Sequence, residues 1–445
     1  MKTGKLSNIV RLSAYAALMV AFLASCVSTQ TAVDTRDLSY LYNPIKNPVT
    51  PRYIVTTESA NQASLGVKFF ANELFFSEAN AQGVPTSSMI ITVKLFNTTR
   101  GMALSDTTQY IMNIIKEKEK QEYVYHLPIN VEPNLEYVAE VKILDRLRSL
   151  VMQAFIPFNT YSLTSRYNYV ARGHFAKNEL FNPVVRVDEF ANLVYLRGHA
   201  DSLYLAYYKS YTTIPDPPSM LLPEKAIDYG PDTIVSVAYS DTLPMMFPRP
   251  GIYLCSVDSN ITDGFTFLNF GPSFPEMNKP EVMIGPVAYL ATENELNNMR
   301  TAERPKVALD EFWIKCGGNV EKARELIRIY YTRVLYANYY FTSYKEGWRT
   351  ERGMIYLLYG PPDKVYKNPE GESWGYMKAE VRSSWGTRYK VKEEYLYFNF
   401  KKKNSTFSDN DYYISRSETL VTFWEQAVAA WRKGIVFRLD NPEEF

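Results

Sequence analysis

The sequence contains few of the residues that most often carry out chemistry, with 3 cysteines and 3 histidines among its 445 residues. The histidines, His126, His174 and His199, lie too far apart in the chain for the His-Glu-x-x-His spacing of a metal site. The sequence also lacks a Gly-x-Ser-x-Gly elbow, a Walker loop and a dinucleotide-binding fingerprint. These absences predict no catalytic residues, no metal and no cofactor, and so a protein that is not an enzyme. Carboxylate pairs of the glycoside-hydrolysing kind stay open, because a sequence does not give the distance between two acids.

An excess of one charge is also missing, since 49 basic and 48 acidic residues give a formal net charge of +1. This balance provides no electrostatic basis for binding nucleic acid. Beyond the N-terminus, no stretch is long and apolar enough to predict a transmembrane helix. Cys255 and Cys316 are a lone pair rather than a disulfide framework, and we expect two free thiols.

The N-terminus has the pattern of a secretory signal peptide. Lys2 and Lys5 precede an uncharged apolar run from Leu12 to Leu23, which is short for a membrane span. Leu23-Ala-Ser-Cys26 resembles the lipobox of bacterial lipoproteins, in which the cysteine is acylated and becomes the first residue. We therefore expect a signal peptide over residues 1–25, and a membrane anchor through acyl chains on Cys26, each buried methylene contributing about 0.8 kcal/mol.

The residues after Cys26 bear on location. No acidic residue occurs between Cys26 and Asp34. Lipoproteins that are retained at the inner membrane, or exported to the cell surface, carry acidic residues directly after the acylated cysteine, and this sequence resembles neither signal. The expected location is thus the outer membrane, facing the periplasm. Residues 26–50 are polar, without apolar periodicity, and are expected to be a tether.

Two blocks of short, β-rich runs separated by turn-forming stretches follow the tether. In the first block, residues 51–159, the alternation of Tyr137, Ala139 and Val141 is typical of strands buried on one face. The second block covers residues 160–288. Each block predicts a β-sandwich. The expected strands are residues 64–71, 89–96, 122–128 and 136–144 in the first block, and 193–197, 202–208, 233–239, 250–255 and 264–270 in the second.

From residue 289 to 445 the periodicity becomes helical, which predicts an α+β domain. Thr292 and Asn319 are expected to cap helices, and Gly317-Gly318 to end the helix before Asn319. The whole chain is thus expected to be two tandem immunoglobulin-like sandwiches followed by this α+β domain. Its expected helices are residues 293–299, 306–315, 320–341 and 418–433, and its expected strands are 354–359, 372–376 and 394–400.

One motif in this last part is specific. Gly347-Trp348-Arg349-Thr350-Glu351-Arg352-Gly353, followed by Met354-Ile-Tyr-Leu-Leu-Tyr-Gly360-Pro361-Pro362-Asp363, resembles the signature of the GWxTD-domain family, over roughly residues 309–400. That family consists largely of exported proteins of Bacteroidota and related phyla, and its molecular activity is undefined. The resemblance implies a fold and a compartment but no mechanism. One departure is Glu351, where the family has Asp.

The residues of the motif suggest a structural role. Thr350 is expected to cap a turn, Gly353 to adopt an unusual backbone angle, and the Gly360–Asp363 segment to break a strand, with Asp363 binding backbone amides. Trp348 and Trp374 are expected to fill a helix–sheet junction. The alternative is that the motif forms an exposed Trp-Arg-Asp patch that meets a ligand or partner. The order of elements is also similar to a small lipoprotein of the outer-membrane β-barrel assembly machinery, by arrangement only.

Three functions are compatible with these features. The favoured one is a non-catalytic scaffold or accessory lipoprotein that binds another envelope protein, in outer-membrane assembly or secretion. The second is a glycan- or peptidoglycan-binding lipoprotein, because the sequence contains 35 tyrosines and aromatic faces stack on sugars. An enzyme of unrecognised type is the third, and would require a cleft with convergent polar groups.

Overall fold

The computed structural model describes residues 37–43, 49–78, 83–220, 230–385, 388–403 and 405–439, which belong to one compact unit. The expected signal peptide, the expected acylation site Cys26 and most of the tether lie outside the described residues. Among the helices that the structure describes, none combines the length and apolar character needed to cross a membrane.

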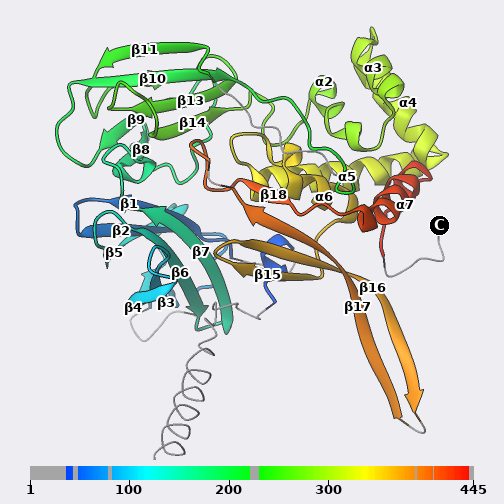
Figure 1. The fold of residues 1–445 in the computed structure, drawn as a ribbon, viewed down its shortest axis with the longest axis horizontal. Coiled ribbons are helices and arrows are strands. Elements are labelled where there is room, and N and C mark those ends of the chain that lie inside the picture. Colours follow the sequence, from blue (N-terminus) through cyan, green and yellow to red (C-terminus); the bar gives the residue numbers. More distant parts are fainter. Residues whose placement is uncertain are drawn as a thin grey trace, which may run out of the picture. The chain divides into compact units, whose positions relative to one another are not determined.

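The first seven strands form two antiparallel sheets with a shared core (Figure 1). They are β1 (Arg52–Thr57), β2 (Gln62–Phe70), β3 (Thr86–Asn97), β4 (Ala103–Ile115), β5 (Glu122–Asn130), β6 (Glu136–Asp145) and β7 (Leu150–Asn159). One sheet has the strand order β1-β2-β5, and the other β4-β3-β6-β7. Leu65 and Val67 of β2 are buried with Ile91 and Val141 of the other sheet. Alternate residues of β3 are buried, as expected for a strand with one face toward a core.

The next seven strands form a second pair of antiparallel sheets. They are β8 (Tyr169–Gly173), β9 (Phe190–Tyr195), β10 (Ser202–Lys209), β11 (Thr233–Ala238), β12 (Met245–Met246), β13 (Gly251–Ser256) and β14 (Phe265–Asn269). The strand orders are β12-β9-β8 and β11-β10-β13-β14. Leu193 of the first sheet and Tyr253 and Phe267 of the second lie in one core. A short 3-10 helix, η2 (Arg166–Asn168), precedes β8.

The C-terminal part begins with helices and ends with a four-stranded antiparallel sheet of order β15-β16-β17-β18. Phe341 at the end of α5 packs on Trp374 of the sheet, with ring centroids 5.2 Å apart. The helices are α2 (Pro280–Met283), η3 (Pro286–Tyr289), α3 (Glu293–Thr301), α4 (Pro305–Gly317), α5 (Val320–Phe341), η4 (Gly347–Arg349), α6 (Glu351–Tyr359), η5 (Glu418–Leu420) and α7 (Val421–Arg432). The strands are β15 (Lys364–Asn368), β16 (Gly371–Trp385), β17 (Arg388–Lys402) and β18 (Tyr412–Ile414).

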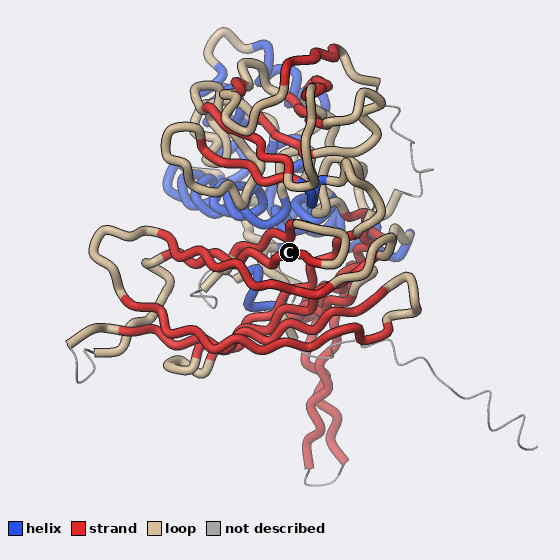
Figure 2. The backbone as a smooth tube through the Cα atoms, turned by 90° about the vertical axis from the view of Figure 1, so that its left-hand side faces the viewer, coloured by secondary structure: helices blue, strands red, loops and turns tan. Residues whose placement is uncertain are grey.

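Strands β16 and β17 extend well beyond the rest of their sheet (Figures 1 and 2). β15 pairs only with Gly371–Gly375, and β18 only with Phe400–Lys402. The remainder of β16 and β17 is therefore a two-stranded arm.

The expected fold class is confirmed, because antiparallel sheets in two sandwiches precede an α+β part. The expected domain boundaries after residues 159 and 288 stay predictions. The helix caps are also confirmed: Thr292 forms a capping box with Glu295, the side chain of Asn319 accepts from the amide of Lys322, and Gly318 has φ of 75° at the end of α4.

One element was predicted wrongly. Residues 354–359 form the second half of helix α6 rather than a strand. Their continuous apolar run fits a buried strand and a fully buried helix equally well, and every residue from Arg352 to Tyr359 is buried. The Gly360–Asp363 segment consequently ends a helix instead of breaking a strand. The prediction also missed strands β1, β4, β7, β8, β12, β15 and β18.

Residues 37–43, at the start of the described chain, pack into the core of the C-terminal part. The amide of Leu38 donates to the carbonyl of Val365 in β15 at 2.7 Å, and the hydroxyl of Tyr356 in α6 donates to the carbonyl of Tyr42 at 2.9 Å. Leu38 and Tyr42 are buried in the same core as the helices.

Candidate functional site

The Gly-Trp-Arg-Thr-Glu-Arg-Gly motif forms η4 and the first turn of α6, at the centre of the C-terminal core. Gly347 lies against the backbone of α5, where a Cβ atom would come within 1.9 Å of the carbonyl oxygen of Ala337. A Cβ on Gly353 would likewise come within 1.9 Å of the carbonyl oxygen of Gly347. The expected unusual backbone angle at Gly353 is wrong, since it is not among the glycines with positive φ. Glycine is required there because two backbone segments approach closely.

Trp348 is fully buried, and its surroundings fix the turn. The amide of Trp348 donates to Asn338 Oδ1 at 3.2 Å, and its carbonyl accepts from the hydroxyl of Tyr289 at 2.9 Å. The guanidinium of Arg349 lies 4.0 Å from the centroid of the Trp348 ring. Trp374 is also fully buried. Neither tryptophan therefore contributes to an exposed patch.

The next two residues of the motif begin helix α6. Thr350 is its N-cap: the hydroxyl accepts from the amide of Gly353 at 3.0 Å and donates to the carbonyl of Gly347 at 2.7 Å. The capping role expected of Thr350 is confirmed. Glu351 follows in the first turn and pairs with Arg416, with 2.6 Å between Oε1 and Nη2. Burial raises the pKa of Glu351, while Arg416 acts in the opposite direction.

The turn after α6 connects the helix to the sheet. Gly360 has φ of 80°, a conformation that favours glycine, and Pro361 and Pro362 follow it. Asp363 Oδ2 accepts from the amide of Met377 at 2.8 Å, and the amide of Asp363 donates to the carbonyl of Gly375 at 3.0 Å. The amide-binding role expected of Asp363 is thus confirmed, and the turn positions β15 beside β16.

Arg352 and Glu372 form the core of a buried polar network. The Arg352 and Glu372 side chains are 3% and 2% exposed, and Nη1 lies 2.9 Å from Oε1. Glu372 also accepts from the hydroxyl of Tyr42 at 2.7 Å and from Trp374 Nε1 at 2.9 Å, and pairs with Lys367 Nζ at 3.2 Å. Burial alone would raise the pKa of Glu372, but Lys367 and Arg352 together with the hydrogen bonds from Tyr42 and Trp374 outweigh it and lower the pKa to about 2. Glu372 is therefore ionised at neutral pH.

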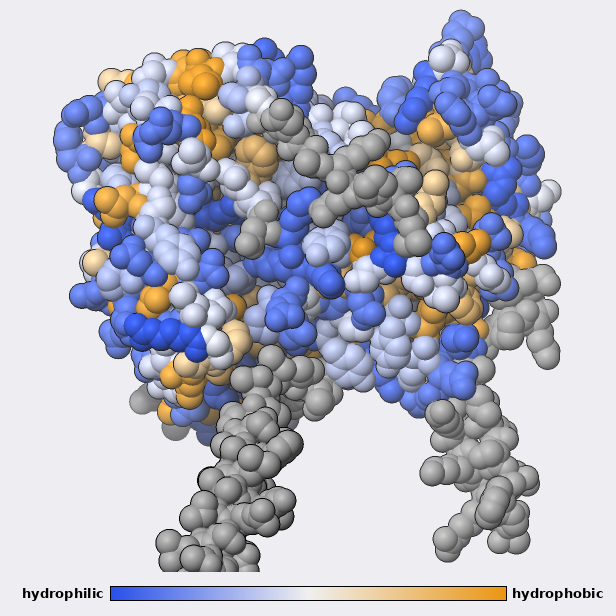
Figure 3. Space-filling model, in the orientation of Figure 1, coloured by the Kyte–Doolittle hydropathy of each residue, from blue (hydrophilic) through white to orange (hydrophobic). Residues whose placement is uncertain are grey.

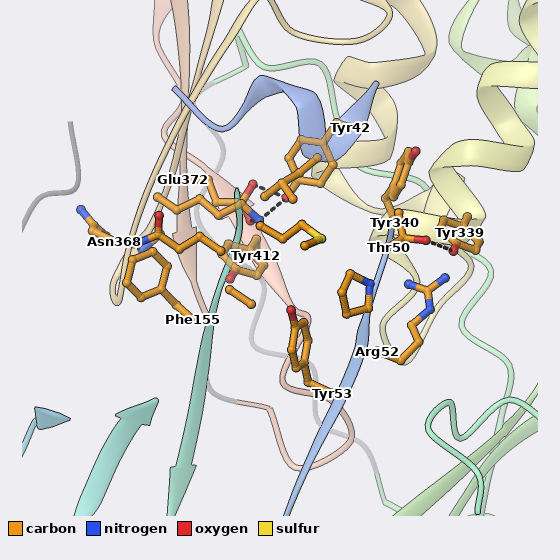
Figure 4. Close-up of a pocket in the computed structure, with 17 residues that line it drawn as sticks. Tyr42, Thr50, Arg52, Tyr53, Phe155, Tyr339, Tyr340, Asn368, Glu372 and Tyr412 are labelled. Carbon is orange, nitrogen blue, oxygen red and sulfur yellow. Dashed lines mark hydrogen bonds and ion pairs between the residues drawn. The ribbon is translucent and has the colours of Figure 1, made fainter. Parts of the chain in front are cut away.

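This network lines a cleft, here called the central cleft (Figure 4). The cleft has two adjoining lobes of about 210 and 510 Å3, which share residues including Arg52, Tyr53 and Tyr412. Its walls come from β1 and β7 of the first sandwich, from the second sandwich near residues 180–183, and from the C-terminal part. In Figure 4, Tyr42 and Glu372 lie on one side of the cleft, and Arg52 and Tyr339 on the other.

Cations outnumber anions around the larger lobe. Its charged lining residues are Arg52, Arg166, Arg352, Lys367 and Lys402 on the basic side, and Glu372 and Asp409 on the acidic side. Half-buried rings of Tyr53, Phe155, Phe181, Tyr340 and Tyr412 lie between them. Such a lining can hold an anionic group in an aromatic surround.

The sequence prediction found part of this site and missed the rest. Arg352 and Trp374 were singled out and do belong to the network, but Tyr42, Lys367 and Glu372 were not. Tyr42 and Glu372 are 330 residues apart, so no local spacing could link them. One signal was available in the sequence. Glu372 and Trp374 are two residues apart in a predicted strand, so their side chains point to the same face, which would place the carboxylate beside a buried tryptophan.

The other candidate residues do not form a site. Cys255 and Cys316 are free and buried, and burial raises the pKa of the Cys255 thiol to about 12. His126 pairs with Glu179 at 2.9 Å, and His174 hydrogen-bonds Asn192. Within the described residues no group of His, Cys, Asp and Glu has a metal-binding arrangement.

The fold and motif together define a class: β-sandwiches joined to an α+β part whose core is built around a Gly-Trp turn. Residues 251–433 match the model of the GWxTD domain family, which confirms the resemblance given by the motif. The match starts at the first residue of β13, and so includes the end of the second sandwich. No curated protein matches the chain.

Comparison with solved structures gives only remote similarities. A β-glucuronidase of Bacteroides uniformis is 12% identical with a TM-score of 0.18, covering 28% of this chain and 13% of the enzyme. B. uniformis β-glucuronidase 2 bound to cyclophellitol-6-carboxylate aziridine is 11% identical with a TM-score of 0.17, covering 26% and 14%. The chain thus matches only about one seventh of the length of these enzymes, and the low TM-scores carry no inference about function.

Proposed function

We propose that the protein is a non-catalytic, lipid-anchored scaffold of the cell envelope that binds a partner protein through the first sandwich. The observation that carries this proposal is strand β4. It is the last strand of its four-stranded sheet, is 13 residues long, and has large apolar side chains in solvent. Leu104, Ile111 and Ile115 are 57%, 66% and 56% exposed. A long edge strand with exposed apolar side chains is a template for another strand.

The apolar surface continues from β4 across the sheet. Ile111 lies opposite Ile90, Ile90 opposite Leu144, and Leu144 opposite Val151, so that one row crosses all four strands. Directly paired residues lie on the same face of a sheet. Figure 3 shows hydrophobic residues at the surface near the position of β3 and β4 in Figure 1. A continuous apolar row of this kind supports binding of a protein rather than contact with water.

The buried motif supports the same proposal indirectly. Because Trp348, Thr350 and Gly353 are committed to the core, the GWxTD-like part is best understood as a rigid base, and binding is assigned to another surface. The anchor on Cys26 would then hold this base at the outer membrane, facing the periplasm.

The test is cross-linking in intact cells followed by affinity purification and mass spectrometry. We expect one stoichiometric envelope protein with the native chain, and its loss with Ile111→Lys, which puts a charge on the exposed strand. Ile234→Lys is the matched control, because Ile234 on β11 of the other sandwich is similarly exposed at 55%. Recovery of the same partner from Ile111→Lys, or of none from abundant folded native protein, would contradict the proposal.

The anchor itself is tested separately. Native protein should fractionate with membranes and carry acyl chains on its N-terminal cysteine by mass spectrometry, whereas Cys26→Ser should be released. An unmodified cysteine on the mature native protein would exclude the lipoprotein assignment. That result would not bear on binding through β4, which the Ile111→Lys experiment tests.

Glycan binding is a second proposed function, favoured by one observation, the aromatic and cationic lining of the central cleft. Half-buried tyrosine rings next to charged groups are the features that hold a sugar by stacking and hydrogen bonding.

A further inference from the structure

Lys402 places an ammonium group without a partner at the central cleft. It is the last residue of β17, pairs in register with Tyr412 of β18, and lines the larger lobe. Burial lowers the pKa of its ammonium group, with Asp409 opposing the effect and Arg166 and Arg352 adding to it. The backbone amide of Lys402 donates to the carbonyl of Glu370 at 2.7 Å, whereas no hydrogen bond or ion pair within the described part of the chain joins its ammonium group to a partner. A half-buried ammonium near two other cations is costly unless an anion comes to it.

Two more donors around the same lobe are unsatisfied among the described residues. Arg352 Nε and Ser343 Oγ are both buried without a hydrogen-bond partner, and both residues line the lobe. Arg52 also lines the lobe, and its guanidinium stacks on the ring of Tyr339 at 4.0 Å. Arg352 Nε and Ser343 Oγ are closed off from solvent, so Arg52 is the donor of these three that a ligand in the lobe can meet.

The size and walls of the cleft narrow the ligand further. The larger lobe holds about 510 Å3, in the range of small-molecule sites and far more than a single inorganic anion fills. Rings of Tyr53, Tyr340 and Tyr412 line it, and their hydroxyl groups add polar contacts to flat apolar faces.

We propose that the central cleft binds an acidic saccharide, with Lys402 holding its carboxylate and the tyrosine rings holding its sugar units. This inference rests on the second function proposed above and names its ligand class. The carboxylate supplies the charge that Lys402 lacks. Hydroxyl groups of the sugar form hydrogen bonds with Arg52 and with the tyrosine hydroxyl groups of the lining, and its apolar face packs on the rings.

The test is titration calorimetry on the purified, detergent-solubilised full chain with a matched pair of probes. Digalacturonate is the acidic probe, and galactobiose is the neutral disaccharide of the same size. We expect digalacturonate to bind at least tenfold more tightly than galactobiose. Lys402→Met should remove that preference without lowering the melting temperature, because it removes an unpartnered ammonium.

Lys401→Met is the matched control, since Lys401 is the adjacent residue of β17 and is exposed. It should keep the native preference for digalacturonate. Inorganic phosphate is the third probe and distinguishes a simple anion site.

Each other outcome overturns the proposal. Equal affinity for the two disaccharides removes the role of Lys402, and phosphate binding as tightly as digalacturonate shows a simple anion site. Absence of binding by every probe rejects the cleft as a site. The β4 proposal is unaffected by any of these results, because the cell cross-linking with Ile111→Lys tests it independently.

Discussion

At the scale of single residues, the buried carboxylate of Glu372 joins four side chains, those of Tyr42, Arg352, Lys367 and Trp374. Removing one member of a buried ion pair leaves the other charge uncompensated, at a cost of about 3–5 kcal/mol. For Glu372→Gln we expect a loss of this size at pH 7, because Arg352 and Lys367 both lose their anion. Urea unfolding measures it, with Glu370→Gln, an exposed neighbour, as the unchanged control.

The pH dependence of stability follows from the same group. Folding lowers the pKa of Glu372 from the ordinary 4.5 to about 2. The ionised form therefore contributes stability above pH 4.5, and this contribution is lost as the pH falls toward 2. The native protein should lose stability over this interval, and Glu372→Gln should lose less. An unchanged slope in the variant would show that other carboxylates carry the acid sensitivity.

Gly353 gives a prediction from steric exclusion alone. For Gly353→Ala we expect destabilisation of about 3 kcal/mol, because the added methyl group meets the carbonyl oxygen of Gly347 and a backbone atom cannot move aside as a side chain can. Gly230→Ala is the control, since a Cβ there meets nothing within 4 Å. Thermal unfolding of the two variants compares them directly, and equal melting temperatures would refute the close approach.

At the scale of elements, helix α6 depends on its N-cap more than an exposed helix does. Replacing an N-cap threonine by alanine costs about 0.5–2 kcal/mol. Thr350→Ala should be at the upper end, because the buried amide of Gly353 and the carbonyl of Gly347 both lose a partner. Thr292→Ala, at the exposed cap of α3, should be at the lower end. Chemical denaturation of both variants tests this ranking, which a larger loss for Thr292→Ala would reverse.

Elements with a clear period or cap could be predicted from the sequence, and fully buried elements could not. α5 repeats apolar residues at helical spacing behind the Asn319 cap, and β6 alternates, so both were found. Residues 354–359 of α6 are apolar on every side of the helix, so their sequence shows no helical periodicity and was assigned as a strand. β4 was missed because it is an edge strand in which apolar residues such as Ile111 lie on the exposed face and its polar and apolar residues do not alternate. The site was out of reach because it joins Tyr42 to residues 330 positions later.

At the scale of the whole molecule, polar contacts from Arg416 connect the second sandwich to the C-terminal part. Arg416 Nη1 donates to the carbonyls of Asp216 and Pro217 at 2.8 and 2.6 Å, while Nη2 pairs with Glu351. For Arg416→Ala we expect faster hydrogen exchange in residues 210–218 with little change in the sandwich strands. Arg300→Ala on the exposed face of α3 is the control. Unchanged exchange in that loop would show that packing alone holds it.

The segment 37–43, at the start of the described chain, is held in the C-terminal part through Tyr42. Tyr42 contributes a ring buried beside Phe341 and Trp374 and a hydroxyl that donates to Glu372 and accepts from Lys367 at 2.7 Å. These contacts join the segment to the helices and the sheet of the C-terminal part.

Tyr42→Phe keeps the ring and loses the hydroxyl, so we expect a loss of about 1–3 kcal/mol from the unsatisfied charged network. Tyr42→Ala also removes the ring and should cost about 3–5 kcal/mol. Denaturation monitored by tryptophan fluorescence reports the C-terminal part, since Trp348, Trp374 and Trp431 are buried there. If both variants unfold as the native protein does, the contacts of Tyr42 contribute nothing to the stability of the C-terminal part.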